Sequence, residues 1–306
     1  MSTKLQLSAS PIGILSVSMS AILWGTVGIA TQAIYQRSDL TAVTVGFYRL
    51  SVAFPVVAFL YWKIVDKQRP QIGYREYWKM ALIGVLLAFY QVFFFASISY
   101  VGVAIATLIT LCIAPVLVSV LSVVFLKEAL TGYTVSALLA ALTGTVLLVG
   151  FPEQGSLQGG NTSMGVMLAL GSATGYAVVA LMGRTIAVTC HPLLSTTVSF
   201  GVGAVALFPF AANNVFSATH SIQIWELILY VGLVPTAVAY TLFFSGMRSI
   251  KASTASILTL LEPLTATALA WVFFAERLAP SGIVGALLLL GAIVILFKGE
   301  KEVMTR

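Results

Sequence analysis

The sequence predicts an all-α integral membrane protein of ten transmembrane helices, arranged as two inverted-topology repeats of five helices each. Three observations predict this fold: the composition, the division of the chain into ten apolar blocks, and a match between its two halves. The 306 residues are 59% hydrophobic and only 8% charged, whereas soluble domains carry about 25% charged residues. So few charged side chains cannot cover a water-exposed surface, and most of the surface must therefore contact lipid.

Charged and turn residues divide the chain into ten apolar blocks. Each block is close to the length of about 20 residues that a helix needs to cross the hydrocarbon core of a bilayer. Helices are the expected spanning element, because an open strand would leave backbone groups unpaired in lipid and the blocks lack the alternation of barrel strands. The blocks run over residues 12–34, 41–62, 77–98, 103–126, 131–150, 164–186, 193–211, 224–246, 252–275 and 279–297.

The basic residues between the blocks gather on one side of this arrangement. If the N-terminus is cytoplasmic, thirteen Lys and Arg residues fall on the cytoplasmic side and only Arg37 and Arg277 fall outside. Short loops rich in Lys and Arg stay in the cytoplasm. We therefore expect both termini to be cytoplasmic and the chain to be a multi-pass protein of the bacterial plasma (inner) membrane.

The two halves of the chain resemble each other. Residues 97–130 align with residues 245–278 without a gap. In both segments a proline is followed thirteen residues later by a glutamate, and the matched pairs are Pro115 with Pro263 and Glu128 with Glu276. The expected repeats are residues 1–150 and 151–306. Because each repeat would hold an odd number of helices, the second would cross the membrane in the opposite sense, a design common among secondary transporters.

Only two formal charges lie deep in the predicted helices, Arg49 and Glu262. A charge there costs roughly 3 kcal/mol or more unless it is paired, hydrated or neutralised. Both side chains are therefore expected to face the interior of the bundle. Two interpretations remain open. They bind substrate, with Arg49 taking a carboxylate and Glu262 an ammonium group or a coupling proton. Alternatively, they form a structural ion pair or hydrogen-bond network between helices.

Aromatic and amide side chains inside the blocks are the further candidates for a substrate-binding cavity, since rings stack on flat apolar groups and polar tips fix orientation. These candidates are Trp24, Tyr90, Gln91, Tyr176 and Tyr240. For each of them the alternative is core packing or lipid contact. Pro115 and Pro263 are candidate hinges, because proline removes a helical hydrogen bond; the alternative is that they only shape packing.

Four short motifs carry a resemblance to a known family: Trp24-Gly25, Tyr48-Arg49, Ala114-Pro115 followed by Glu128, and Leu261-Glu262-Pro263 followed by Glu276. In their order and spacing the chain resembles the drug/metabolite transporter (DMT) superfamily, in its ten-helix EamA-type branch. Within that branch it is most similar to aromatic amino-acid exporters of the YddG type. The resemblance implies export of small metabolites through a central cavity lined mainly by the first, third, fourth, sixth, eighth and ninth helices.

We therefore expect a secondary-active or facilitative transporter that exports small metabolites, above all aromatic or neutral amino acids, by alternating access. Other small metabolites and cationic drugs are the alternative substrates. A membrane-embedded enzyme or a channel is the alternative of another class. The chain has no phosphate-binding loop, no H-E-x-x-H and no G-x-S-x-G, so we expect no catalytic residues, metal or cofactor. The expected partners are the substrate and the lipid bilayer, with no nucleic acid.

Overall fold

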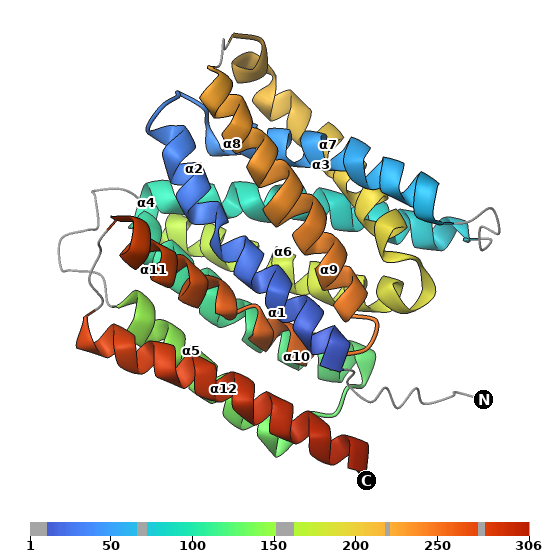
Figure 1. The fold of residues 1–306 in the computed structure, drawn as a ribbon, viewed down its shortest axis with the longest axis vertical. Helices are drawn as coiled ribbons and strands as arrows, with labels where there is room; N and C mark the ends of the chain where they lie inside the picture. The colour runs from blue at the N-terminus through green and yellow to red at the C-terminus, as the bar shows by residue number, and fades with distance from the viewer. Residues whose placement is uncertain (1–10, 66–71, 151–161, 218–220, 275–278, 306) are drawn as a thin grey trace.

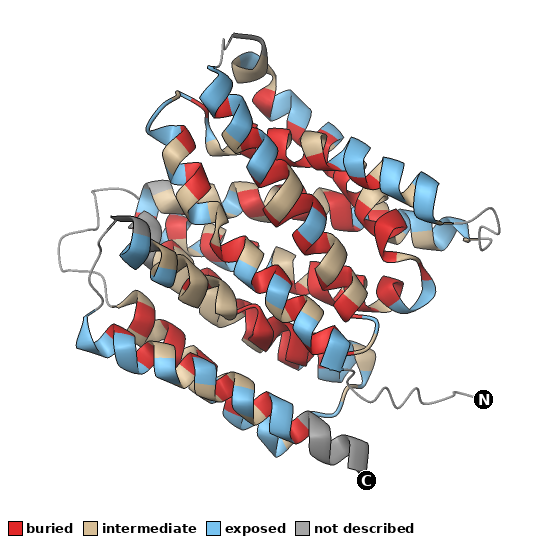
Figure 2. Cartoon of the chain, in the orientation of Figure 1, coloured by how far each residue is buried: buried red, intermediate tan, exposed pale blue. Residues whose placement is uncertain are grey.

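The structure, a computed structural model, describes residues 11–65, 72–150, 162–217, 221–274 and 279–305. Within these residues all regular structure is helical (Figure 1), which confirms the expected all-α class. Nine helical stretches in the described residues are long and apolar enough to cross a membrane. Buried residues lie toward the middle of the bundle and exposed ones on its outer faces (Figure 2), and many of the exposed side chains are large and apolar, as a lipid-facing surface requires.

The first half of the chain supplies five helices. They are α1 (Pro11–Gly25), α2 (Val27–Tyr35), α3 (Ala42–Ile64), α4 (Tyr74–Leu126) and α5 (Gly132–Val149). Threonine hydroxyls cap two of them, since Thr41 and Thr131 accept hydrogen bonds from backbone N–H groups at the starts of α3 and α5. The first expected span is divided at Thr26, whose hydroxyl donates to the carbonyl of Leu23 at 2.7 Å.

Helix α4 contains both of the helices expected at residues 77–98 and 103–126. A straight helix of 53 residues would be about 80 Å long, far more than the roughly 30 Å hydrocarbon core. Contacts with α6 indicate that the two parts run in opposite directions. Along α6, the residues that it meets on the first part have falling sequence numbers, and those that it meets on the second part have rising sequence numbers. Gly165 lies against Tyr100 and Gly175 against Tyr90. Ala177 belongs to one apolar cluster with Val118, and Arg184 pairs with Glu128, just after the end of α4.

The second half contains more interruptions. Its elements are α6 (Thr162–Thr189), α7 (Pro192–Ser217), α8 (Ile222–Gly232), the π-helical turn η1 (Leu233–Val238), α9 (Ala239–Gly246), α10 (Ala252–Leu258), α11 (Leu261–Phe274) and α12 (Pro280–Thr305). The helices α8 and α9 continue through η1 as one span, Ile222–Gly246.

The continuous helix expected at residues 252–275 is wrong, because the chain breaks at Thr259–Leu260 between α10 and α11. Pro263 has no N–H and cannot bond the carbonyl of Thr259. The N–H of Glu262 bonds that carbonyl instead, at 3.0 Å. Pro263 therefore lies in the first turn of α11, where its missing N–H costs little, whereas Pro115 does lie inside a helix.

Paired small residues allow close approach of the helices that frame the bundle. A Cβ atom on Gly84 of α4 would contact the backbone of Ser199 in α7, and Gly203 lies beside the carbonyl of Gly84. Gly144 of α5 and Gly285 of α12 meet in the same way. Such contacts are typical of helix packing in membranes, where backbones approach at small residues.

Some expected features lie outside the described residues. They are Glu276 and Arg277, and the connection between the proposed repeats at residues 151–161.

Gly84→Ala is expected to lower the free energy of unfolding by about 1–3 kcal/mol, because the new methyl group has no room against the backbone of α7. Gly28→Ala is the matched control: Gly28 is also helical, and a Cβ atom there meets nothing within 4 Å. Unfolding in detergent, followed by circular dichroism, measures both variants. Equal stability of the two would contradict the close α4–α7 contact.

Candidate functional site

A cavity of about 200 Å³ lies in the middle of the bundle. All seven side chains expected to bind substrate line this one cavity: Trp24, Arg49, Tyr90, Gln91, Tyr176, Tyr240 and Glu262. They come from α1, α3, α4, α6, α9 and α11. Pro115 also lines the cavity, while Pro263 is not among the lining residues. Residues far apart in the sequence are thus brought together at one place.

Aromatic rings form one wall of the cavity. The hydroxyl groups of Tyr90 and Tyr240 are hydrogen-bonded at 2.9 Å. The rings of Tyr90 and Tyr176 meet edge to face, with centroids 6.0 Å apart. Trp24 packs on Tyr240 with a centroid distance of 4.9 Å. Because these rings support each other across four spans, the wall offers a fixed apolar surface to a ligand.

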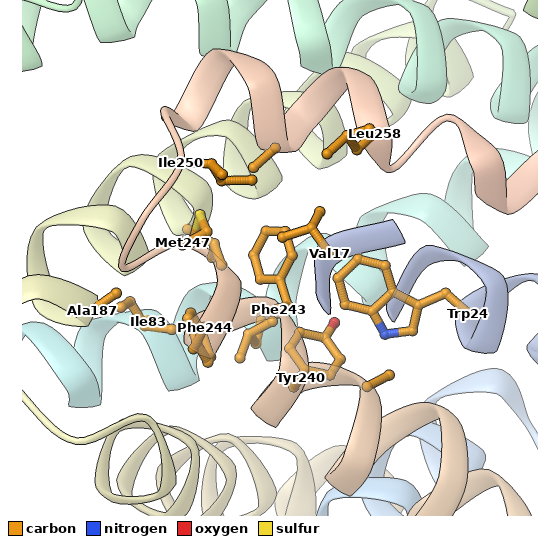
Figure 3. Close-up of a cluster of buried hydrophobic side chains, with 14 of the residues drawn as sticks. Val17, Trp24, Ile83, Ala187, Tyr240, Phe243, Phe244, Met247, Ile250 and Leu258 are labelled. Atoms are coloured by element: carbon orange, nitrogen blue, oxygen red, sulfur yellow. The ribbon is translucent and has the colours of Figure 1, made fainter. Parts of the chain in front are cut away.

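Beside Trp24 and Tyr240 the bundle is filled by apolar side chains (Figure 3). Each is at most 1% exposed, and they come from α1, α9, α10 and the connection before α10. They include Val17, Phe243, Phe244, Met247, Ile250 and Leu258, and we call these six side chains the apolar plug. The cavity is therefore sealed on this side, which is the side on which α9 ends and α10 begins.

Arg49 and Glu262 face the same cavity but are not paired with each other. Among the described residues, no carboxylate lies within ion-pair distance of Arg49 and no cation within that distance of Glu262. Arg49 is 8% exposed, and its Nε donates to the hydroxyl of Thr236 at 3.1 Å. Glu262 follows the break at Thr259–Leu260, and its carbonyl lies against Gly25 of α1. The direct ion pair considered for these two residues is absent from the described structure.

Several polar atoms of the cavity lining have no hydrogen-bond partner in the described part of the chain. They are the Nε1 of Trp24, the Oε1 of Gln91, the Oγ1 of Thr110 and the Oγ of Ser172. Buried polar groups in native proteins are nearly always bonded to protein or water, so these atoms indicate a site that binds a polar ligand or water. Thr110 and Ser172 were missed by sequence reasoning; as hydroxyl residues inside apolar blocks they gave only a weak signal.

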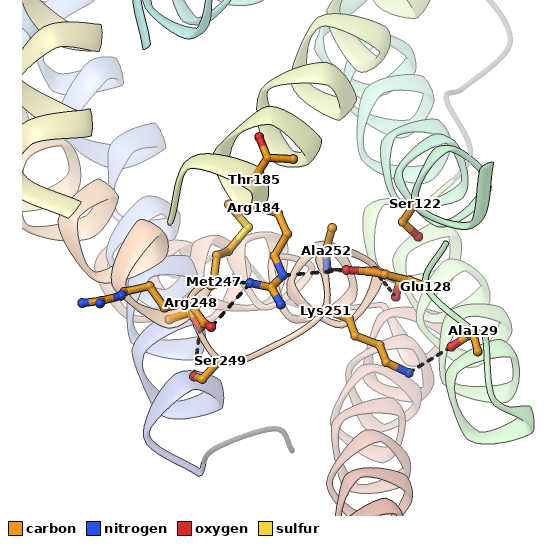
Figure 4. Close-up of polar contacts among 12 residues, drawn as sticks. Ser122, Glu128, Ala129, Arg184, Thr185, Met247, Arg248, Ser249, Lys251 and Ala252 are labelled. Atoms are coloured by element: carbon orange, nitrogen blue, oxygen red, sulfur yellow. Dashed lines mark hydrogen bonds and ion pairs between the residues drawn. The ribbon is translucent and has the colours of Figure 1, made fainter. Parts of the chain in front are cut away.

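Another buried charge, Arg184 of α6, was also missed. Its Nε lies 3.8 Å from Oε1 of Glu128, and its terminal nitrogen donates to the carbonyl of Met247 at 2.7 Å (Figure 4). Both carboxylate oxygens of Glu128 accept the N–H of Ala252 at 3.1 Å. Lys251 donates to the carbonyl of Ala129 at 2.9 Å. We call these five residues and Ala129 the Glu128 network; it joins α4, α6, α9 and α10 beyond the apolar plug of Figure 3.

His191 caps a helix instead of contributing to the cavity. Its Nδ1 accepts the N–H of Leu193 at the start of α7, at 3.2 Å. Burial and the nearby Arg248 lower the pKa of His191, which favours the neutral ring that this acceptor role requires. In the described residues, no three His, Cys, Asp or Glu side chains are grouped closely enough to hold a metal ion.

Comparisons with known proteins agree with this architecture. A protein of Bacillus subtilis (strain 168) named "Uncharacterized transporter YwfM" is 30% identical over 290 residues, which cover 94% of this chain and 95% of that protein. An "Uncharacterized transporter" of Archaeoglobus fulgidus is 29% identical over 284 residues, covering 92% and 95%. A solved structure described as "Crystal structure of protein" superimposes with a TM-score of 0.77 at 18% identity, covering 95% and 98% of the two chains, and shows the same fold.

The family model described as "EamA-like transporter family" matches the chain twice, over residues 11–150 and 163–298. These two matches cover most of the chain. The two relatives above are named as transporters, and each aligns with this chain over nearly its whole length. The chain is therefore a multi-pass membrane transporter of small molecules and belongs to the EamA-like transporter family.

Proposed function

We propose that the protein exports small zwitterionic metabolites, with aromatic and neutral amino acids as its leading substrates. The observation that supports this most is the presence of Arg49 and Glu262, without ionic partners among the described residues, in one cavity with an aromatic wall. The carboxylate of an amino acid would bind Arg49 and its ammonium group Glu262. The side chain would lie against Trp24 and the tyrosines.

The size and charge of the cavity favour this class over its competitors. A volume of about 200 Å³ is below the roughly 300–1,000 Å³ of sites for drug-sized ligands, which disfavours bulky cationic drugs. Phosphorylated metabolites are usually held by several basic groups, and Arg49 is the only Lys or Arg among the residues that line the cavity. Other small metabolites with one anionic and one cationic group remain the alternative.

Transport would occur by alternating access, with residues 1–150 and 151–306 as two inverted repeats that rock around the cavity. The two separate matches of the family model support this division. The apolar plug of Figure 3 and the Glu128 network of Figure 4 together close one end of the cavity. Under the charge bias of the loops, that end is cytoplasmic, so the plug and network have to part before a substrate enters from the cytoplasm.

A channel and a membrane-embedded enzyme are the alternatives of other classes. A carrier shows saturable flux and exchanges labelled for unlabelled substrate, whereas flux through a channel rises with concentration without such saturation. An enzyme would change the chemical identity of the compound it takes up.

Purified protein in liposomes is expected to take up labelled phenylalanine or tryptophan with saturable kinetics. Trp24→Ala and Glu262→Ala should each reduce this uptake by roughly tenfold, the loss expected for about 1.4 kcal/mol of binding. Trp62→Ala is the matched control, because Trp62 is 69% exposed and does not line the cavity. Flux of another metabolite class with none for any amino acid would overturn the substrate proposal.

If Glu262 carries a coupling proton, Glu262→Gln should abolish the pH dependence of uptake, because the amide cannot exchange a proton. Uptake is measured from acid to alkaline pH for wild type and variant, at saturating substrate. A pH profile that is unchanged in Glu262→Gln would exclude this residue as the proton carrier.

Arg184→Gln is expected to open the end of the cavity that the Glu128 network closes, because it removes the ion pair and the bond to the Met247 carbonyl. The measurement uses Leu258→Cys, at a buried plug position, in a chain whose native Cys112 and Cys190 are replaced by alanine. A membrane-impermeant maleimide added from the Glu128 side should label this cysteine several-fold faster in Arg184→Gln. Arg75→Gln, at an exposed position, is the control, and equal labelling of both would refute the gate.

A further inference from the structure

We propose that Thr236 is a positioning residue that fixes the guanidinium of Arg49 for binding a substrate carboxylate. This inference rests on the proposed function of the cavity. Thr236 itself is fully buried and is not among the residues that line the cavity. It would therefore act on a substrate only through Arg49.

The hydrogen bonds of Thr236 assign its single hydroxyl proton. The hydroxyl donates to the carbonyl of Val231 at 2.7 Å, and the same oxygen lies 3.1 Å from Nε of Arg49. A hydroxyl has one proton and two acceptor lone pairs. With the proton used on Val231, the oxygen accepts from Arg49, and the Nε–H of the guanidinium is held in one direction. The two terminal nitrogens are the edge that forms paired bonds with a carboxylate.

Pro235, inside the π-helical turn η1, makes the Val231 carbonyl available for this role. In an α-helix that carbonyl would accept the N–H four residues later, but residue 235 is proline and has none. The hydroxyl of Thr236 takes the place of the missing donor. Backbone distortions of this kind occur frequently at functional sites. Pro235 and Thr236 are thus adjacent for a physical reason: the first frees an acceptor and the second uses it.

Close packing brings this turn against α3 at the level of Arg49. A Cβ atom on Gly232 would lie 2.7 Å from Cβ of Val52 and 3.4 Å from the carbonyl oxygen of Arg49. No larger side chain fits there without moving η1 away from α3. Val231, Gly232, Pro235 and Thr236 therefore form a preorganised seat for one arginine, which we call the Arg49 seat.

The experiment compares three changes at Thr236 with a control in the same span. Thr236→Val removes the hydroxyl at nearly constant shape, Thr236→Ala removes it without the added methyl group, and Thr236→Ser keeps it. Thr241→Val is the matched control, because the Thr241 hydroxyl also bonds a carbonyl of its own span, that of Ala237 at 2.7 Å. Unfolding temperatures in detergent show that each variant is folded.

Transport of labelled phenylalanine and of 2-phenylethylamine, which lacks the carboxylate, supplies the first measurement. Thr236→Val and Thr236→Ala are expected to raise KM for phenylalanine by about tenfold, the usual effect of losing one hydrogen bond to a charged group, with kcat little changed. KM for 2-phenylethylamine should stay the same, and Thr236→Ser and Thr241→Val should behave as wild type. In an Arg49→Gln background, Thr236→Val should have no further effect.

The second measurement does not need a transported substrate. The Nε–H proton of Arg49, identified in NMR spectra by its loss in Arg49→Gln, should exchange with water faster in Thr236→Val and Thr236→Ala but not in Thr241→Val. Unchanged exchange overturns the inference, whichever ligand the cavity binds. Faster exchange without phenylalanine transport would leave the Arg49 seat standing and overturn the proposed substrate. A KM effect of Arg49→Gln that Thr236→Val does not share would refute the positioning role alone.

Discussion

The structure depends on one constraint: within a bilayer, each polar backbone or side-chain group needs a bonding partner in the protein or in a molecule that the protein binds. Irregular backbone is therefore tolerated only where it is buried or lines a cavity. The described chain follows this rule. The division at Thr26 lies between the lining residues Trp24 and Val27. The break falls at Thr259 and Leu260, which are lining residues themselves, two residues before Glu262. Pro115 lines the cavity as well, and it frees the carbonyl of Leu111, another lining residue.

The charged side chains inside the bundle meet this need for a partner in two different ways. Arg184 and Glu128, whose side chains are 10% and 11% exposed, are paired, and their remaining bonds go to the connection after α9 and to the start of α10. Such a pair holds helices together but offers nothing to a ligand. Arg49 is buried and Glu262 is partly buried, and neither has an ionic partner among the described residues. An unpaired buried charge is costly, and a ligand of complementary charge would remove that cost on binding.

The sequence was sufficient to predict the fold class, and the seven side chains that it singled out line one cavity. Their binding of substrate stays a prediction. The sequence was not sufficient for Thr110, Ser172 and Thr236. Hydroxyl residues are common in membrane helices, where most of them bond the carbonyl one turn back, as Thr145 does. Which ones face a cavity or an arginine depends on helix rotation, which no local pattern fixes. Arg184, near the end of the block at residues 164–186, was counted among the thirteen basic residues of the cytoplasmic side, because its partner Glu128 is far away in the sequence.

The π-helical turn η1 also sets the rotational phase of everything that follows it in its span. A turn of this kind holds one residue more than an α-helical turn, and one residue corresponds to about 100° of rotation around the axis. Tyr240, whose hydroxyl meets Tyr90, and Phe243 and Phe244 in the plug all come after η1. Deleting a single residue from η1 would turn this aromatic face away from the cavity and bring other side chains of α9 into its place. Which side chains form the cavity wall therefore depends on the number of residues in this span as much as on their identity.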